Sequence, residues 1–287
     1  MRNDFAIFIL THGRANDQKT LNMLKENGYT GKWFLVVDNL DEQLEEYQQK
    51  YREHVIVFDK LAAWGITDTF HNGKMLKAVV FPRNVVFQYA REKGIKSFAM
   101  CDDDISRLNY KHIEGEKLAT DKITRNIDKI LEAYANYAEM AKITVLGMCE
   151  DGVFIGGVNQ LVLNGYTPSI GKFIFFRTED EVKYRGLYYE DNIATFDIPL
   201  QGRMSFSPTI ISTVSQIDTK KTKGGMHDVY ENTSSGYTCS FMVLMVHPSG
   251  IKIVQRKDNW KIRKSQENLR PMLLDEKWRK EAGASEE

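Results

Sequence analysis

The stretch Phe98-Ala-Met-Cys-Asp-Asp-Asp-Ile105 decides the fold, because an apolar run ends there in three adjacent carboxylates. The apolar half has no polar face, which is typical of a strand buried on both sides of a parallel sheet. Three neighbouring carboxylates repel one another at low dielectric, so we expect a positive group among them. A divalent cation such as Mg²⁺ or Mn²⁺, which prefers oxygen ligands, is the simplest candidate. The alternative interpretation is a solvated Asp-rich turn that caps the next helix.

Apolar runs of the same kind recur along the first half of the chain, separated by helical patterns. This alternation predicts an α/β domain with right-handed crossovers. After Met148 the alternation fails and glycines separate short strand-like pieces, which predicts a mixed or antiparallel second half. Pro82 either kinks the third helix or marks its first turn. The expected strands are Phe5–Leu10, Trp33–Val37, His54–Phe58, Ser97–Cys101 and Ile143–Met148, and the expected helices are Asp17–Asn27, Asp41–Arg52, Lys74–Lys93 and Thr120–Ala141.

Polar residues directly follow four of these strands. The carboxyl ends of parallel strands meet at one edge of a sheet, where such folds bind their ligands. We therefore expect the ligand-binding residues in four short segments, namely Thr11–Arg14, Asp38–Asn39, Asp59–Lys60 and Asp102–Asp104.

The composition narrows the possible partners and compartments. The 287 residues carry 39 Lys+Arg and 39 Asp+Glu, and this balance speaks against binding nucleic acid by overall charge alone. The average hides a basic segment, since residues 251–280 contain ten basic and four acidic residues, with Trp260 and Trp278 among them. No apolar run approaches the roughly 18 residues of a membrane span, so we expect a cytoplasmic protein without a membrane partner. Three widely spaced cysteines fit reduced, buried thiols.

At this point the sequence resembles nucleotide-sugar glycosyltransferases of the GT-A fold, a Rossmann-like α/β architecture with a mostly parallel central sheet flanked by helices. In that family a helix with an Arg-Asn pair precedes a strand and an Asp-x-Asp motif that binds the metal and the diphosphate of the donor. Here the pair is Arg83-Asn84, and the motif lies within Asp102-Asp103-Asp104. The turn Ile9-Leu-Thr-His-Gly-Arg14 resembles the one that holds the nucleotide, and Asp38 matches a position that recognises the base or ribose.

Two downstream motifs extend the resemblance. Tyr188-Tyr-Glu-Asp-Asn192 resembles the motif from which inverting members draw a general base, and it also fits a helix start enriched in acids. Gly224-Gly-Met-His-Asp228 resembles a late loop that supplies a histidine to the metal, although His227 also fits an ordinary surface position. The implied roles are a metal site at Asp102, Asp104 and His227, a base at Asp191 or Glu190, and nucleotide-sugar binding by Thr11, His12, Arg14, Asp38, Lys74, Arg83, Asn84 and Asp103.

Within the fold the chain is most similar to the phage glycosyltransferases associated with TET/JBP dioxygenases. The resemblance implies an inverting, Mn²⁺- or Mg²⁺-dependent transfer of a sugar, with UDP as the expected nucleotide, to 5-hydroxymethylcytosine in bacteriophage DNA. A phage protein of this kind would act in the host cytoplasm. Transfer to a glycan, lipid or protein, a metal-dependent nuclease or phosphotransferase, and a non-catalytic binding module are the alternatives.

We expect two parts in the chain. Residues 1–230 form the catalytic domain, with a nucleotide-sugar half at 1–110 and an acceptor half at 111–230. Residues 231–287 form an extension packed on that domain, whose basic residues 252–280 either face double-stranded DNA or form an ordinary amphipathic helix.

Overall fold

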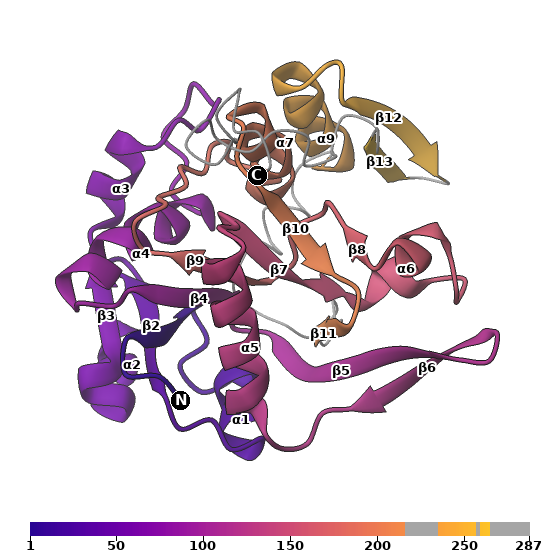
Figure 1. Ribbon diagram of the computed structural model, residues 1–287. Coiled ribbons are helices and arrows are strands. Elements are labelled where there is room, and N and C mark those ends of the chain that lie inside the picture. The colour runs from indigo at the N-terminus through magenta and orange to yellow at the C-terminus, as the bar shows by residue number, and fades with distance from the viewer. Residues whose placement is uncertain (216–234, 257–258, 265–287) are drawn as a thin grey trace, which may run out of the picture.

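The computed structural model describes residues 1–215, 235–256 and 259–264 (Figure 1). Its strands are β1 Phe5–Leu10, β2 Lys32–Asp38, β3 Val55–Phe58, β4 Ser97–Asp102, β5 Ile105–Glu114, β6 Lys117–Lys122, β7 Val145–Glu150, β8 Tyr166–Thr167, β9 Phe173–Arg177, β10 Ser205–Pro208, β11 Ile211–Ser215, β12 Ile251–Arg256 and β13 Asn259–Lys264. Its α-helices are α1 Lys19–Glu26, α2 Leu44–Tyr51, α3 Lys60–Ile66, α4 Val80–Glu92, α5 Ile127–Met140, α6 Gln160–Asn164, α7 Glu190–Leu200 and α9 Ser235–Val246, and two short 3₁₀ helices are η1 Arg52–His54 and η2 Asp151–Phe154.

One large mixed sheet organises the molecule, with strand order β3-β2-β1-β4-β9-β7-β11-β5-β6 and with β10 and β8 attached at β7. The strands β3, β2, β1 and β4 are parallel, as the alternating first half of the sequence predicts. Strand β9 enters antiparallel between β4 and β7. The predicted fold class, a mostly parallel α/β sheet with a mixed second half, is confirmed.

Helices cover both faces of this sheet, so its central strands are buried on both sides (Figure 1). Alternate residues of β1 enter different cores. Phe8 faces a core shared with Phe87 of α4, and Ile7 faces a core shared with Leu131 of α5. Both faces of β1 and β4 are therefore apolar, which is why these strands read as unbroken apolar runs in the sequence.

Two predicted helices have different boundaries in the structure. The helix predicted from Lys74 begins at Val80, so Pro82 lies in the first turn, where its missing N–H costs nothing. The helix predicted from Thr120 is wrong at its start, because Lys117–Lys122 form β6 and the helix covers only Ile127–Met140. Strands β5 and β6 form a hairpin whose turn contains Gly115 in the left-handed region at φ 61°.

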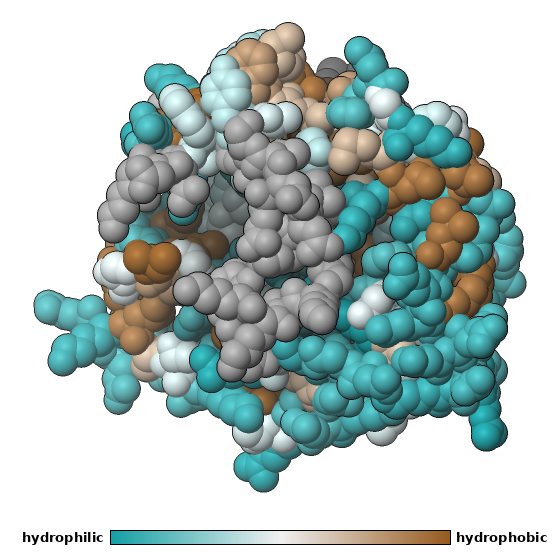
Figure 2. Space-filling view, turned by 180° about the vertical axis from the view of Figure 1, so that it is seen from behind, coloured by the Kyte–Doolittle hydropathy of each residue, from teal (hydrophilic) through white to brown (hydrophobic). Residues whose placement is uncertain are grey.

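The described part of the C-terminal region packs on α7. Ile193 and Phe196 of α7 share a small apolar cluster with Val243 of α9 and Ile251 of β12. In Figure 1 these elements lie together at the upper right. The opposite side of the molecule is hydrophilic over most of its lower part (Figure 2).

Two further expectations, on the state of the cysteines and on membrane-spanning segments, can be compared with the structure. Its three cysteines are free and buried, as predicted for reduced thiols: Cys101, Cys149 and Cys239. None of the helices that the structure describes is long and apolar enough to cross a bilayer.

Candidate active site

A cavity of about 400 Å³ opens at the carboxyl ends of β1, β2 and β4. Further walls come from the start of α4, the residues before β9 and the start of α7. Lys60 of the expected segment Asp59–Lys60 lines this cavity, and so do ten of the thirteen residues to which the resemblance assigned a role: Thr11, His12, Arg14, Asp38, Arg83, Asp102, Asp103, Asp104, Glu190 and Asp191.

Two predicted site residues, Lys74 and Asn84, do not line the cavity. Lys74 places its ammonium 6.0 Å from the centre of the Trp64 ring, and Lys77 lines the cavity instead. Asn84 joins α4 to the backbone of Tyr184. Its side-chain amide donates to Tyr184 O at 2.9 Å and accepts from Tyr184 N at 2.8 Å. His227 lies outside the described residues.

The backbone of the Asp triplet is fixed by Thr20 of α1. The Thr20 hydroxyl donates to Asp102 O at 2.6 Å and accepts from Ile105 N at 3.0 Å, and Thr20 N donates to Asp103 O at 3.1 Å. Thr20 is completely buried. The turn after β4 therefore has a fixed shape, and the three Asp side chains point in different directions from it.

Asp103 points inward to the loop after β1. Its carboxylate accepts a hydrogen bond of 2.6 Å from Thr11 Oγ1 and forms an ion pair with Arg14. Burial raises the pKa of Asp103 to about 6, although Arg14 and Thr11 oppose this rise. Both oxygens of Asp103 are thus engaged by the protein itself.

Asp102 and Glu190 share the buried guanidinium of Arg83. Arg83 Nη2 lies 3.3 Å from Asp102 Oδ1, and Arg83 Nε donates to Glu190 Oε1 at 3.0 Å. Burial raises the pKa of Asp102, and it raises that of Glu190 to about 7, in both cases against the effect of Arg83. Arg83 joins the end of β4 to the start of α7.

Asp191 is the more accessible member of the acidic pair. Its side chain is half-buried on the cavity wall, and Asn192 Nδ2 donates to Asp191 Oδ1 at 2.9 Å. Tyr189, just before the pair, has φ 52°, a left-handed conformation that turns the chain into α7. The helix thereby begins with two acids at its positive end, one engaged with Arg83 and one facing the cavity.

Asp104 lies against a lysine that the sequence analysis missed. Lys172 Nζ is 3.0 Å from Asp104 Oδ2, and Ser215 Oγ donates to Asp104 Oδ1 at 3.1 Å. Burial alone would lower the pKa of Lys172, but Asp102 and Asp104 outweigh it and raise that pKa. Lys172 precedes an antiparallel strand, so it is the start of β9 that reaches the edge where the parallel strands end. Only the pairing of β9 with β4 reveals this placement, and sequence order does not.

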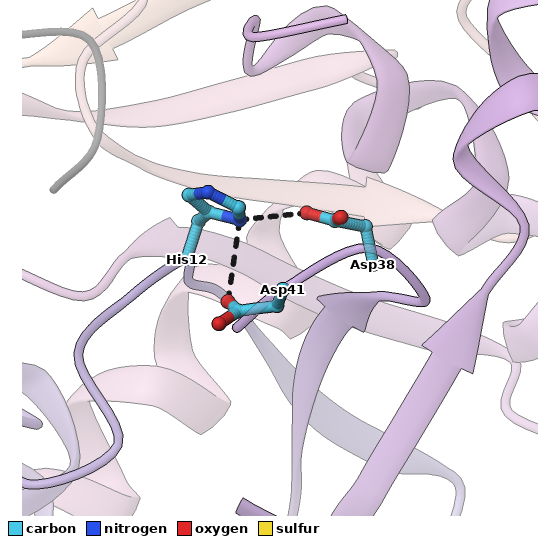
Figure 3. A group of neighbouring side chains, drawn as sticks. All are labelled: His12, Asp38 and Asp41. Atoms are coloured by element: carbon cyan, nitrogen blue, oxygen red, sulfur yellow. Dashed lines mark hydrogen bonds and ion pairs between the residues drawn. The ribbon is translucent and has the colours of Figure 1, made fainter. Parts of the chain in front are cut away.

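A second group of charged residues lies at the ends of β1 and β2 (Figure 3). His12 Nδ1 lies 2.8 Å from Asp38 Oδ2 and 3.2 Å from Asp41 Oδ2. Lys60 Nζ adds a bond of 2.9 Å to Asp38 Oδ2. The hydrogen bond with Asp38 and the one with Asp41 raise the pKa of His12 to about 9. His12, Asp38 and Asp41 have the spacing of metal ligands, but an imidazolium and an ammonium already neutralise the two carboxylates.

Two solved structures of glucosyl-3-phosphoglycerate synthase from Mycobacterium tuberculosis are similar to this chain. The complex with Mg²⁺ and UDP has 10% identity and a TM-score of 0.43, over 91% of this chain and 87% of the other. The complex with Mn²⁺, UDP-glucose and phosphoglyceric acid has 9% identity and a TM-score of 0.44, over 93% and 91%. No curated protein matches in sequence.

The family comparison covers most of the chain. Residues 5–225 match the family described as TET-Associated Glycosyltransferase, a span that contains every described residue of the cavity. This match confirms the resemblance drawn from the Asp triplet and the Arg-Asn pair, and it makes the protein an enzyme of the glycosyltransferase class. The chain belongs to the TET-associated glycosyltransferase family.

Proposed function

We propose that this enzyme transfers the sugar of a UDP-sugar, with Mn²⁺ or Mg²⁺, to the hydroxymethyl group of 5-hydroxymethylcytosine in DNA. The observation that carries the proposal is the meeting of three groups in one cavity: the Asp triplet, the cations Arg14 and Arg83, and the acidic pair at the start of α7. Glycosyl transfer needs these three functions together, for a cation, a diphosphate and an acceptor hydroxyl.

Asp102 and Asp104 are the members of the triplet that fit a divalent cation. Their side chains are each 25% exposed, whereas that of Asp103 is 6% exposed and held by Arg14. Carboxylate oxygens suit Mg²⁺ and Mn²⁺. A bound cation would stabilise the negative charge of the departing diphosphate. His227 remains a proposed third ligand.

Residues after β1 and β2 would hold the nucleotide part of the donor. Arg14 Nε is buried and has no hydrogen-bond partner among the described residues, so a phosphate oxygen would satisfy it. His12 and Asp38 stand at the neighbouring strand ends, and we assign to them the base or ribose. Lys77 takes the place we expected for Lys74 near the phosphates.

Asp191 is the better candidate for the general base. Glu190 is bonded to Arg83 and has 6% of its surface exposed, so its main action is to position Arg83. Asp191 faces the cavity, where an acceptor hydroxyl can reach it. We propose that Asp191 accepts the hydroxyl proton as the oxygen attacks the anomeric carbon from the side opposite the diphosphate, which inverts that carbon.

The described part of the basic segment supports a DNA acceptor. Lys252 lies opposite Arg263 in the β12–β13 ribbon, and Lys261 points to the same side as Arg263, since alternate residues of a strand share a face. All three are exposed. At the end of the ribbon, Lys264 Nζ donates to Ser169 Oγ at 3.1 Å. Burial lowers the pKa of Lys264, and the charges of Asp191 and Glu150 counteract it, so the negative charge of the proposed base acts on the end of the ribbon.

We retain the division into a catalytic domain at 1–230 and an extension at 231–287 as part of the proposal, supported by the packing of α9 and β12 on α7. The remaining basic residues of the segment, 265–280, lie outside the described residues.

Nucleotide release tests the enzymatic part of the proposal without reference to the acceptor's fate. The purified protein is incubated with Mn²⁺, a panel of UDP-sugars and DNA that contains 5-hydroxymethylcytosine, and free UDP is measured. We expect release with at least one donor, its loss on chelation of the metal, and its loss in Asp104→Asn with an unchanged Tm. Undiminished release by Asp104→Asn would remove the metal assignment.

A further inference from the structure

Lys172 forms an ion pair with Asp104, one of the two proposed metal ligands, in the wall of the cavity. Its ammonium contacts Asp104 Oδ2 at 3.0 Å and Oδ1 at 3.4 Å, while Ser215 Oγ donates to Oδ1. Asp102 and Glu150 add further negative charge around the same ammonium. Both oxygens of Asp104 therefore accept hydrogen bonds, and the shorter bond of Lys172 is to Oδ2.

The backbone of Lys172 is held in place, while its side chain is partly exposed in the cavity. Lys172 O accepts a hydrogen bond from Asp102 N at 3.3 Å, and the next residue starts β9. Gly171 passes so close to Met148 O that a Cβ there would clash with it, which holds the segment in place. The Lys172 side chain is 32% exposed and that of Asp104 is 25% exposed, and both line the cavity. A partly exposed ion pair of this kind contributes little to the stability of the fold, so little is lost when it breaks.

We propose that Lys172 is an exchangeable counter-cation of Asp104, which holds the carboxylate while no divalent cation is bound and must leave it when one binds. This inference rests on the proposed function, because it takes Asp104 as a metal ligand. The same four-carbon side chain, once released, remains in the cavity and can turn to a donor phosphate. Lys172 is thus a positioning residue for the Asp104 carboxylate before the metal binds and for the donor phosphate afterwards.

The test measures Mn²⁺ binding to the full-length protein by calorimetry, without donor or acceptor. Because the ion pair has to break before the metal binds, Lys172→Met should bind Mn²⁺ about fivefold more tightly than the wild type. Lys172→Arg, which keeps the charge, should stay within about twofold of the wild type. Lys183→Met removes an exposed lysine that does not line the cavity and serves as the matched control, with unchanged affinity.

Two further measurements separate the possible failures. Asp104→Asn should lose Mn²⁺ binding, and if it does not, the metal assignment itself is wrong. If Asp104→Asn loses binding but Lys172→Met binds Mn²⁺ no more tightly than the wild type, the exchange role of Lys172 is overturned and the metal site stands. With Mn²⁺ saturating, Lys172→Met should bind UDP more weakly than the wild type, and equal UDP affinity would overturn the contact with the donor phosphate. Thermal unfolding of each variant checks that it is folded.

Discussion

At the residue scale, the three aspartates of one short turn have three different environments. Asp103 is bonded to Thr11 and Arg14, Asp102 to Arg83, and Asp104 to Lys172 and Ser215. We expected the metal at Asp102 and Asp104, and the burial of Asp103, whose side chain is 6% exposed against 25% for each of the other two, gives a physical reason for leaving it out. Lys172 could not be found from the sequence, because nothing near it marks an active-site residue and only β-sheet pairing brings it to Asp104.

Asp191→Asn tests the proposed base. We expect the rate of transfer to fall about 10²- to 10⁴-fold, which is the usual contribution of a positioned base. Donor binding, measured as UDP affinity with Mn²⁺, should survive because the Asp191 carboxylate is hydrogen-bonded by Asn192, which is not one of the predicted nucleotide-binding residues. Glu190→Gln is the matched variant: it weakens the hold on Arg83 and should therefore reduce UDP affinity. Normal transfer by Asp191→Asn would assign the base elsewhere.

The His12 group gives a dependence of stability on pH whose sign can be stated in advance. The pKa of His12 is raised from 6.5 to about 9 in the folded protein, mainly by hydrogen bonds with Asp38 and Asp41. Its stabilising effect is therefore complete below pH 6.5 and is lost as pH rises through about 9. We expect His12→Gln to lower Tm at pH 6 and to have a much smaller effect at pH 10.

Calorimetry of the wild type and His12→Gln at these two pH values measures the difference. His71→Gln, at an exposed loop position outside the group, controls for the loss of an imidazole elsewhere. An equal Tm difference at pH 6 and pH 10 would contradict the assignment of a charged His12.

At the element scale, the predictable elements are those with strong local patterns. The strands β1 and β4 lie where their apolar runs predicted, because burial on both faces leaves no polar residue in the run. The hairpin of β5 and β6 was missed, since Lys117–Lys122 is mostly exposed and has no apolar face to reveal it. Helix α3 was missed as well, because Asp59 was interpreted as a ligand residue. In the structure the Asp59 side chain accepts hydrogen bonds from Leu61 N and Ala62 N and so caps the start of this helix.

Thr20→Val tests whether α1 holds the triplet in shape. The substitution leaves Asp102 O and Ile105 N without their buried partner, which costs about 1–3 kcal/mol of unfolding free energy. We expect a lower Tm together with weaker Mn²⁺ binding. Thr178→Val, which removes a bond of 2.7 Å to Ile95 O outside the cavity, should lower Tm alone. Equal Mn²⁺ affinity in both variants would show that α1 supports only the fold.

At the scale of the whole molecule, zero net charge conceals a separation of charges. Carboxylates gather in the cavity, while Lys252, Lys261 and Arg263 form the exposed face of the β12–β13 ribbon. The sequence showed the basic segment, but it could not show that Lys264 at the end of the ribbon bonds to Ser169 and is affected by the charge of Asp191, because these residues are far apart in the chain.

Reversal of these three charges tests the ribbon as a DNA-binding surface. Lys252→Glu/Lys261→Glu/Arg263→Glu should weaken binding to duplex DNA and reduce the salt dependence of the binding constant by about 0.9 for each phosphate that the ribbon no longer neutralises. UDP affinity should not change. The matched control reverses Arg107, Lys117 and Lys122 on the β5–β6 hairpin, which are also exposed. An equal fall in DNA affinity in both triple variants would mean that overall charge, and not the ribbon, is responsible.

The central claim is transfer of a sugar to a hydroxymethylated base in DNA, and the mass of the product nucleoside tests it most directly. The enzyme is incubated with Mn²⁺, a panel of sugar nucleotides and two duplexes that differ only in carrying cytosine or 5-hydroxymethylcytosine, and the DNA is digested to nucleosides. We predict that the nucleoside of 5-hydroxymethylcytosine gains the mass of one glycosyl residue with at least one donor and that the nucleoside of cytosine gains none. Release of the nucleotide from a donor without any glycosylated nucleoside would mean that the sugar is transferred to water, and it would contradict the claim.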